Sequence, residues 1–368
     1  MPAPDASALP RQPAAARAAS FVTAAERPKA FTSGVRFWYT CRAMTTSEDI
    51  TGRRVVLTGG AGFLGSHLAQ ALCRDNTVVL FDNGRRDALQ YTDLADRPTV
   101  EVVRGDVRDP EAVRSAVSGA DIVIHLAAIA GVSSYYRSGV ETMTVNYTGT
   151  ATVLAAALET CPDLQRFVNV STSEVYGAEA RDAREDAPTA VGPAGEPRWT
   201  YAAGKMAAEH LCLAYHRHEG LPVASVRPFN IYGPRQVGEG AVQVLARRAL
   251  AGDDLVVTGD GRQVRAWCYV DDFVAGVLRV LTVPEAVGAV FNIGNERAAV
   301  TVQELAETIR RLAESDSKIV FRPHPGVDVR MRVPDISRAR SMLGYDPAVG
   351  LEEGLSKAID WYREHPLE

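Results

Sequence analysis

The sequence predicts an α/β fold built on a doubly wound parallel sheet, followed by a smaller α/β lobe. Three observations favour this fold class. Apolar runs recur from residue 55 onward, alanine-rich helical stretches separate several of them, and a glycine-rich turn follows the first run. Strands that alternate with helices are typical of a parallel sheet covered on both faces.

The composition limits the classes of protein that the chain can belong to. Its 368 residues are 46% hydrophobic and 23% charged, which is enough to bury a large core. A net charge of −5 offers no broad basic field, so we expect a small-molecule partner and neither nucleic acid nor an anionic membrane. No apolar run approaches the roughly 20 residues that cross a bilayer.

The cysteines argue against a disulfide framework and against a zinc site. They are odd in number, widely scattered and without a C-x-x-C pair. We therefore expect no metal and a reducing, cytoplasmic location. The five residues are Cys41, Cys73, Cys161, Cys212 and Cys268.

Residues 1–43 form a segment rich in Ala, Pro and Arg, with only Asp5 and Glu26 as acids. The segment lacks the continuous apolar core of a secretory signal, and we expect it to be disordered. It is either an organelle transit peptide or an over-extended start. We favour the second, because Met44 begins a polar stretch that leads directly into the first strand.

The glycine turn after the first strand is the first functional motif. Gly59, Gly62 and Gly65 stand between a strand and a helix, which is the context that a Rossmann-type dinucleotide site requires. The first glycine permits the tight turn, and the second lets the backbone approach a pyrophosphate at the positive end of the helix. Gly65 should permit close helix–strand packing, and we expect Phe63 and Leu64 to contact the cofactor from the same turn.

Asp82, about 20 residues further on, predicts which cofactor binds. Its carboxylate is placed to accept hydrogen bonds from the adenine-ribose hydroxyls and to repel a 2′-phosphate, so NAD is preferred over NADP. Arg85 and Arg86 weaken this preference, since either could pair with the extra phosphate, although both also fit solvated loop charges. Further cofactor contacts, or ordinary strand-end packing, are expected at Asn83, Asp106, Val107, Leu126, Ala127 and Ala128.

Six apolar runs predict the strands of the sheet, and these lie at 55–57, 78–81, 100–103, 122–125, 167–170 and 223–226. The first helix is expected at 66–74. After Pro228 the chain becomes irregular, with helical stretches at 302–312 and 351–363. We expect an NAD-binding domain over 52–227 and a mainly substrate-binding lobe over 228–368, partly interleaved with it.

Tyr201 and Lys205 are one helical turn apart, so both side chains emerge on one face of a helix. A tyrosine with a pKa near 10 is a poor base at neutral pH, and the ammonium of Lys205 together with a positive nicotinamide would favour the phenolate. This spacing is common by chance. The order of motifs nevertheless favours an enzyme. The pair follows the glycine turn, Asp82 and the Ser-Thr-Ser-Glu stretch at 171–174, and it precedes Arg-Pro-Phe-Asn at 227–230.

With these motifs in order, the sequence resembles the extended short-chain dehydrogenase/reductase family over nearly everything from Arg53 to the C-terminus. The resemblance implies that Tyr201 takes the O4′ proton of a nucleotide sugar as the C4′ hydride passes to NAD. Thr172 would hydrogen-bond that oxygen, and Lys205 would hold the nicotinamide ribose. The resemblance also implies a homodimer through a four-helix bundle that uses 148–158 and 202–215, unless these stretches are buried against the chain's own sheet.

The strand-end stretch Val-Ser-Thr-Ser-Glu-Val-Tyr-Gly at 170–177 is similar to that of UDP-glucuronate decarboxylases. Glu174 stands where galactose-type 4-epimerases usually have a small or apolar residue. Ser173 stands where the deoxyhexose-forming glucose-type 4,6-dehydratases usually have an aspartic acid. GDP-mannose dehydratases share the Thr-Ser-Glu arrangement but prefer NADP, which Asp82 disfavours. A 4,6-dehydratase and a 4-epimerase stay as alternatives.

Two further stretches resemble the decarboxylases. One is Val-Gly-Pro at 191–193 with Pro-Arg-Trp-Thr-Tyr at 197–201, and the other is Arg-Ala-Trp at 265–267. The resemblance implies a catalytic role for Arg265, whose alternative is a contact with the diphosphate or with a core carboxylate. It also implies substrate contacts, for which guanidinium forks suit a diphosphate, although Arg235 also fits a plain surface charge. The expected substrate-binding residues are Tyr135, Ser173, Asn230, Arg235, Arg265 and Arg332.

The function expected from these motifs is NAD-dependent decarboxylation of UDP-glucuronate. Oxidation at C4′ makes the C5 carboxylate a β-keto acid that loses carbon dioxide, while Glu174 and Arg265 position the carboxylate or reprotonate C5. Reduction of the ketone then gives UDP-xylose, or UDP-4-keto-pentose is released. A non-catalytic NAD-binding scaffold is a rival of another class, because the fold alone does not determine function. The intact set of Thr172, Tyr201 and Lys205 disfavours this rival.

Overall fold

The computed structural model describes residues 50–324 and 326–366, so the extension expected at 1–43 lies outside the described residues. Its centre is a seven-stranded sheet in the order β12-β7-β5-β4-β1-β2-β3. The strands are β1 (Arg54–Thr58), β2 (Thr77–Asp82), β3 (Val100–Arg104), β4 (Ile122–His125), β5 (Arg166–Val170), β7 (Val223–Pro228) and β12 (Val290–Ile293). All neighbouring strands are parallel. The six predicted strands are confirmed, and β12 is an addition.

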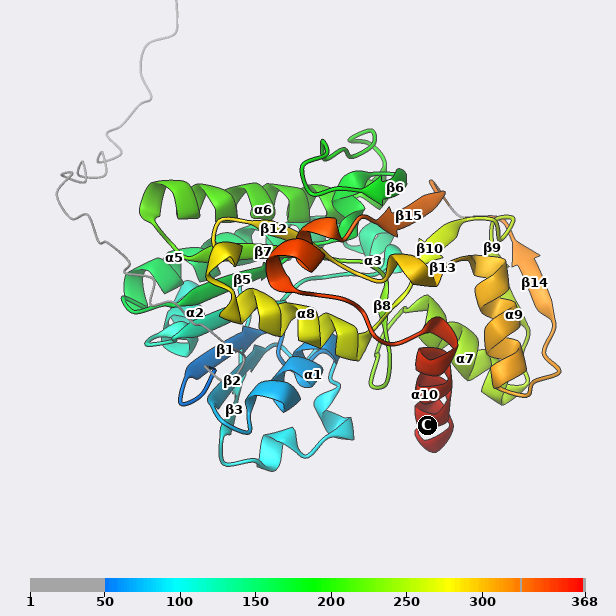
Figure 1. Cartoon of the computed structure of the whole chain (residues 1–368), viewed down its shortest axis with the longest axis horizontal. Coiled ribbons are helices and arrows are strands. Elements are labelled where there is room, and N and C mark those ends of the chain that lie inside the picture. Colours follow the sequence, from blue (N-terminus) through cyan, green and yellow to red (C-terminus); the bar gives the residue numbers. More distant parts are fainter. Residues whose placement is uncertain (1–49, 325, 367–368) are drawn as a thin grey trace, which may run out of the picture. The chain divides into compact units, whose positions relative to one another are not determined.

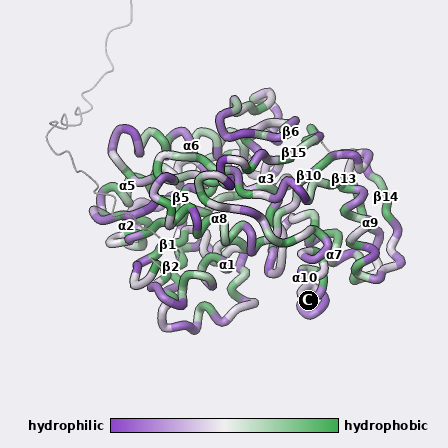
Figure 2. The backbone as a smooth tube through the Cα atoms, viewed as in Figure 1, coloured by the Kyte–Doolittle hydropathy of each residue, from purple (hydrophilic) through white to green (hydrophobic). Residues whose placement is uncertain are grey.

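Helices cover both faces of this sheet, as the doubly wound prediction requires (Figure 1). The helices α1 (Phe63–Leu72) and α8 (Val270–Thr282) cover one face, and α2 (Pro110–Val117), α5 (Thr150–Thr160) and α6 (Thr200–Glu219) cover the other. Strand residues alternate between the two cores, with Val55 and Leu57 on the α1 side and Val56 on the α2 side. Figure 2 shows the resulting hydrophobic colour along β1, β2 and β5.

The first helix differs from its predicted range of 66–74. It begins at Phe63, immediately after Gly62, whose extended backbone forms the N-cap. The glycine turn is therefore shorter than expected, and the helix N-terminus lies within it.

The smaller lobe combines short strands with three helices. A four-stranded sheet in the order β13-β10-β15-β6 contains β6 (Glu179–Ala183), β10 (Val264–Ala266), β13 (Ala299–Thr301) and β15 (Met331–Pro334). Two pairs join β8 (Ile231–Tyr232) to β11 (Cys268–Tyr269) and β9 (Leu255–Thr258) to β14 (Ile319–Arg322). The helices α7 (Ala241–Ala251), α9 (Val302–Leu312) and α10 (Leu351–Glu364) enclose a separate core. The two predicted helical stretches at 302–312 and 351–363 are confirmed.

Short helices carry much of the remaining chain. They are η2 (Leu89–Tyr91), η3 (Leu94–Asp96), α3 (Val132–Arg137), α4 (Gly139–Met143), the π-helical η4 (Thr144–Gly149), η5 (Ser173–Tyr176), η6 (Pro197–Trp199), η7 (Pro284–Ala286), η8 (Glu296–Ala298) and the π-helical η9 (Ala339–Leu343). The strand β6 joins the small sheet although it precedes residue 227, and β12 joins the large sheet although it follows residue 228. A domain boundary at 227/228 stays a proposal.

Within residues 50–324 and 326–366, no helix has the length and apolar character to cross a membrane. The same residues contain no cluster of three or more His, Cys, Asp and Glu side chains that could hold a metal ion. The four described cysteines, Cys73, Cys161, Cys212 and Cys268, are buried free thiols.

Candidate active site

The glycine turn forms a cradle at the carboxyl end of β1. Gly59 has a φ of +71°, and a Cβ there would lie 2.7 Å from the backbone nitrogen of Ala127. A Cβ on Gly65 would lie 2.5 Å from the carbonyl oxygen of Gly59, so the helix can approach the turn this closely only without a side chain. The N-terminus of α1 therefore opens onto a surface without side chains, which suits a pyrophosphate.

Asp82 closes the second strand beside this cradle. Its Oδ2 accepts the N–H of Ala61 at 3.1 Å, and its Oδ1 accepts the N–H of Gly84 at 2.6 Å. Burial raises the pKa of Asp82 above its usual value, and the two backbone N–H groups oppose this shift. A carboxylate has about four lone-pair sites, so Asp82 retains acceptor capacity for ribose hydroxyls.

A cavity of about 450 Å³ runs from this carboxylate to the residues predicted to be catalytic. The volume is within the usual range for a ligand site. All the residues predicted to bind the cofactor line it, namely Gly59, Gly62, Phe63, Leu64, Gly65, Asp82, Asn83, Asp106, Val107, Leu126, Ala127, Ala128, Tyr201 and Lys205. Thr172, Ser173, Glu174, Tyr135 and Asn230 line it as well, whereas Arg235, Arg265 and Arg332 do not.

Tyr201 and Lys205 project from α6 beneath the end of β5. The Lys205 ammonium donates to the carbonyl of Val170 at 2.7 Å, and burial lowers its pKa to about 8. Burial raises the pKa of Tyr201 to about 12, and the hydrogen bond with Thr172 opposes that rise. The protein without cofactor therefore holds Tyr201 as a neutral phenol at neutral pH.

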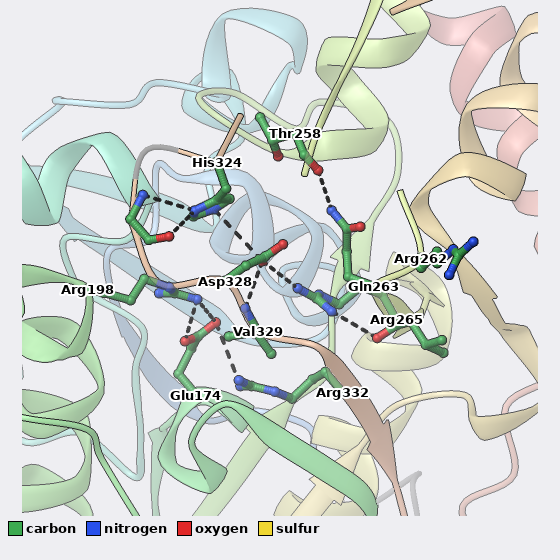
Figure 3. Close-up of polar contacts among 12 residues, drawn as sticks. Glu174, Arg198, Thr258, Arg262, Gln263, Arg265, His324, Asp328, Val329 and Arg332 are labelled. Carbon is green, nitrogen blue, oxygen red and sulfur yellow. Dashed lines mark hydrogen bonds and ion pairs between the residues drawn. The ribbon is translucent and has the colours of Figure 1, made fainter. Parts of the chain in front are cut away.

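The carboxylate of Glu174 lies between the guanidinium groups of Arg198 and Arg332 (Figure 3). One of its oxygens lies 2.8 Å from Nη2 of Arg198, and the other lies 3.7 Å from Nη1 of Arg332. Burial alone would raise the pKa of Glu174, but Arg332 and Arg198 outweigh it and hold the pKa below its usual value. Glu174 is therefore an anion in this structure.

Arg265 lies beside Arg332, on the neighbouring strand. Its Nη1 donates to the carbonyl of Val264 at 2.9 Å, and its Nη2 lies 3.5 Å from Asp328 (Figure 3). Burial, and then the neighbouring charge of Arg332, lower its pKa to about 10. Its catalytic role stays a prediction, because its guanidinium interacts with Asp328 rather than with the cavity.

The other two arginines expected at the substrate have protein partners. Arg332 donates to the carbonyl of Gly177 at 2.5 Å and is 1% exposed. The Nε of Arg235 donates to the ring of His67 at 3.3 Å. Arg235 is buried, so it is not the plain surface charge that its sequence context also allowed.

The sequence pattern did not assign Arg198 or Asp328 to the site. The available signal for Arg198 was its place three residues before Tyr201, within the Pro-Arg-Trp stretch. Asp328 carried no signal, because its distance of 63 residues from Arg265 follows no local pattern.

Comparison with known proteins identifies the family. Residues 55–294 match the model of the NAD dependent epimerase/dehydratase family. The chain is 37% identical over 322 residues to a UDP-N-acetyl-alpha-D-glucosaminuronate decarboxylase from Bacillus cytotoxicus, a match that covers 85% of this chain and 98% of that protein. It is 36% identical to UDP-glucuronic acid decarboxylase 2 from Arabidopsis thaliana, over 85% of this chain and 69% of the relative.

A solved structure agrees with these relatives. UDP-glucuronic acid 4-epimerase from Bacillus cereus, in complex with UDP-glucuronic acid and NAD, matches with a TM-score of 0.77 and 29% identity, covering 84% of this chain and 99% of that chain. The bare glycine cradle and the carboxylate of Asp82 fit the same cofactor. The chain belongs to the NAD dependent epimerase/dehydratase family, and its cofactor is NAD.

Proposed function

We propose that this enzyme decarboxylates UDP-glucuronate through a 4-keto intermediate. The observation that carries the proposal is the position of Glu174, whose carboxylate pairs with Arg198 and Arg332 at the cavity that Thr172 and Tyr201 also line. Loss of a carboxylate from C5 must be followed by protonation there, and Glu174 is an ionisable side chain at the same cavity as Thr172 and Tyr201. The curated relatives that are named decarboxylases support the same reaction.

Tyr201 and Thr172 act at the C4′ oxygen in this proposal. Bound NAD supplies the acceptor for the C4′ hydrogen. Tyr201, once ionised, takes the O4′ proton, and Thr172 donates a hydrogen bond to the same oxygen. The resulting ketone draws electrons from the C5–carboxylate bond as carbon dioxide leaves, and Thr172 and Tyr201 stabilise the enolate oxygen.

Glu174 acts at C5 in this scheme. Its arginine partners orient the departing carboxylate, and after carbon dioxide has left, Glu174, whose side chain is 23% exposed, takes a proton from solvent water and passes it to C5. We propose that six further residues hold the nucleotide sugar, either by direct contact or through Glu174 and its arginine partners. They are Tyr135, Ser173, Asn230, Arg235, Arg265 and Arg332. Reduction of the ketone would give UDP-xylose, and release before reduction would give UDP-4-keto-pentose.

UDP-N-acetylglucosaminuronate is a second candidate substrate. The Bacillus cytotoxicus relative is named for it, and the match spans 98% of that protein. Both candidates carry the C5 carboxylate on which the proposed chemistry depends.

Product mass distinguishes the possible reactions. The enzyme is incubated with NAD and, in separate reactions, UDP-glucuronate, UDP-N-acetylglucosaminuronate, UDP-glucose and GDP-mannose. Decarboxylation removes carbon dioxide, a 4,6-dehydratase removes water and a 4-epimerase leaves the mass unchanged. We expect loss of carbon dioxide from a uronate. Tight NAD binding without turnover of any sugar would favour the scaffold instead.

We further propose a homodimer that pairs through α6 and the neighbouring α4, η4 and α5. Support comes from α4 and η4, where Val140 is 82% exposed, Tyr147 is 40% exposed and Met143 is 38% exposed. These three apolar side chains lie within eight residues of one another in the chain, and contiguous exposed apolar patches mark interaction surfaces. A cytoplasmic location is proposed from the buried free thiols, which fit a reducing compartment.

A further inference from the structure

Arg198 interacts with both groups on which the proposed chemistry depends. It lies in η6, three residues before Tyr201, and its Nη2 donates to Glu174 at 3.0 Å. Its Cζ lies 5.7 Å from the ring centre of Tyr135, and that ring is stacked on Tyr201 with centroids 5.2 Å apart. One guanidinium therefore contacts Glu174 directly and is linked to Tyr201 through the ring of Tyr135.

The protein fixes this guanidinium firmly. Arg198 is 6% exposed, and its backbone N–H donates to the Glu196 carboxylate at 3.2 Å. Its Cζ also lies 5.8 Å from the ring centre of Trp199. Arginine stays protonated even when it is buried, and a charge held away from water acts more strongly on its neighbours.

Several groups from different elements face Tyr201. They are Thr172 after β5, Glu174 in η5, Tyr135 in α3, Arg198 in η6 and Lys205 one turn along α6. Burial raises the pKa of Tyr201, Glu174 raises it further, and Thr172 and Arg198 lower it. Lys205 instead directs its ammonium to the Val170 carbonyl.

Glu174 is in turn faced by Arg198, by Arg332 in β15 and by the charge of Arg265 in β10. Loss of Arg198 would remove a positive charge near Tyr201 and also leave Glu174 with less compensation. Both effects would make Tyr201 harder to ionise.

We propose that Arg198 is a positioning residue that assists ionisation of Tyr201 while it holds Glu174 as an oriented anion. The inference rests on the proposed function, in which Tyr201 is the base and Glu174 acts at C5. It assigns to Arg198 part of the electrostatic role that the sequence pattern gave to Lys205 and a positive nicotinamide.

The test compares Arg198→Met, Arg198→Lys and the double variant Arg198→Met/Glu174→Gln. Arg311→Met is the matched control, since Arg311 forms an ion pair with Glu352 at 2.6 Å outside the site. Two quantities are measured. The first is the pH dependence of single-turnover NADH formation, and the second is the absorbance titration of the Tyr201 phenolate in the NAD complex without substrate, with Tyr201→Phe as the blank.

We expect Arg198→Met to raise the apparent pKa of Tyr201 by about one unit and to slow NADH formation near neutral pH about tenfold, because one unit changes the ionised fraction tenfold. Arg198→Lys keeps the charge, so its pH profile should stay within about threefold of the wild type. The double variant should recover part of the lost rate, because Glu174 no longer opposes ionisation. Arg311→Met should behave as the wild type.

An unchanged Tyr201 titration in Arg198→Met, with only a raised KM, would overturn the proposal and leave Arg198 as a binding residue. Equal shifts in Arg198→Met and Arg198→Lys would also overturn it. Thermal unfolding and NAD affinity report whether the variants fold. If Arg198→Met does not fold, Arg198→Gln takes its place, because it removes the same charge and keeps a polar side chain. If the wild type oxidises a nucleotide sugar but releases no carbon dioxide, the proposed function fails while these titrations still test Arg198.

Discussion

The ring of Tyr135 is stacked on the ring of Tyr201, with centroids 5.2 Å apart and planes within 10° of parallel. Both rings are buried, at 5% and 8% exposure, and both line the cavity. Stacking fixes the plane of the Tyr201 phenol, and the loss of water around it raises the pKa of Tyr201 to about 12. The proposed base is thus well placed, but the protein must supply positive charge to ionise it.

Tyr201→Phe should reduce turnover roughly a hundred- to ten-thousandfold, because it removes the proton acceptor and keeps the stacked ring. NAD affinity should be nearly unchanged, since the glycine cradle and Asp82 are intact. Steady-state turnover and NAD titration check this pair of results. Turnover close to that of the wild type would remove Tyr201 from the chemistry.

Asp82→Asn should weaken NAD binding about tenfold or more and reduce discrimination against NADP. The substitution removes the negative charge that repels a 2′-phosphate and weakens the hydrogen bonds to ribose. Calorimetric titration with each cofactor measures both affinities. Asp106→Asn is a useful comparison, because Asp106 lines the same cavity but forms an ion pair with Arg108 at 2.5 Å. If both affinities of Asp82→Asn match those of the wild type, Asp82 does not contact the ribose.

Glu174→Gln should slow decarboxylation more than the initial oxidation, because Glu174 is assigned to events at C5. In a single turnover, NADH absorbance should rise at a near-normal rate and persist while release of carbon dioxide lags. If both signals slow equally, Glu174 acts in oxidation or in substrate binding. If neither slows, Glu174 is structural.

Lys205→Met should change how stability depends on pH. The folded pKa of Lys205 is lowered to about 8 from 10.5, so between these values the unfolded chain binds a proton that the folded protein releases. Wild-type stability therefore gains on the order of 3 kcal/mol relative to the variant as pH rises through this window, at about 1.4 kcal/mol per unit. Urea unfolding at about pH 7 and about pH 10 measures the difference. A stability difference that is independent of pH would contradict the depressed pKa.

Tyr147→Arg should convert the proposed dimer to monomer, because it places a charge within an apolar helix surface. Phe321→Arg is the matched control, since Phe321 is 48% exposed in the smaller lobe. Light scattering at micromolar concentration should give dimer mass for the wild type and the control. A wild-type monomer would count decisively against the dimer.

Much of the fold follows from local sequence. The glycine turn, Asp82 and the alternating strands depend on neighbouring residues, so their positions could be predicted. The strand β12, which contains Asn292, was not predicted, because it follows Pro228 and lies in the stretch assigned to the substrate-binding lobe. In the structure this asparagine is buried and donates to the carbonyls of Ala183 and Asp335. Those distant partners compensate for a polar group in the core.

The candidate site, like the fold, could be predicted from the sequence only in part. The spacing of Tyr201 and Lys205 placed both on one helix face, but it did not show that the Lys205 ammonium is directed to Val170. Arg198 and Glu174 are 24 residues apart and lie in different elements, η6 and η5. Such side-chain partnerships are set by tertiary packing and have no periodic signal in the sequence.

Release of carbon dioxide tests the central claim most directly. UDP-glucuronate labelled at its carboxyl carbon is incubated with the enzyme and NAD, and labelled carbon dioxide is measured against sugar consumed, with Tyr201→Phe as the blank. The account predicts one carbon dioxide for each sugar consumed and none from the blank. Consumption or isomerisation of the sugar with the label retained in the product would contradict it.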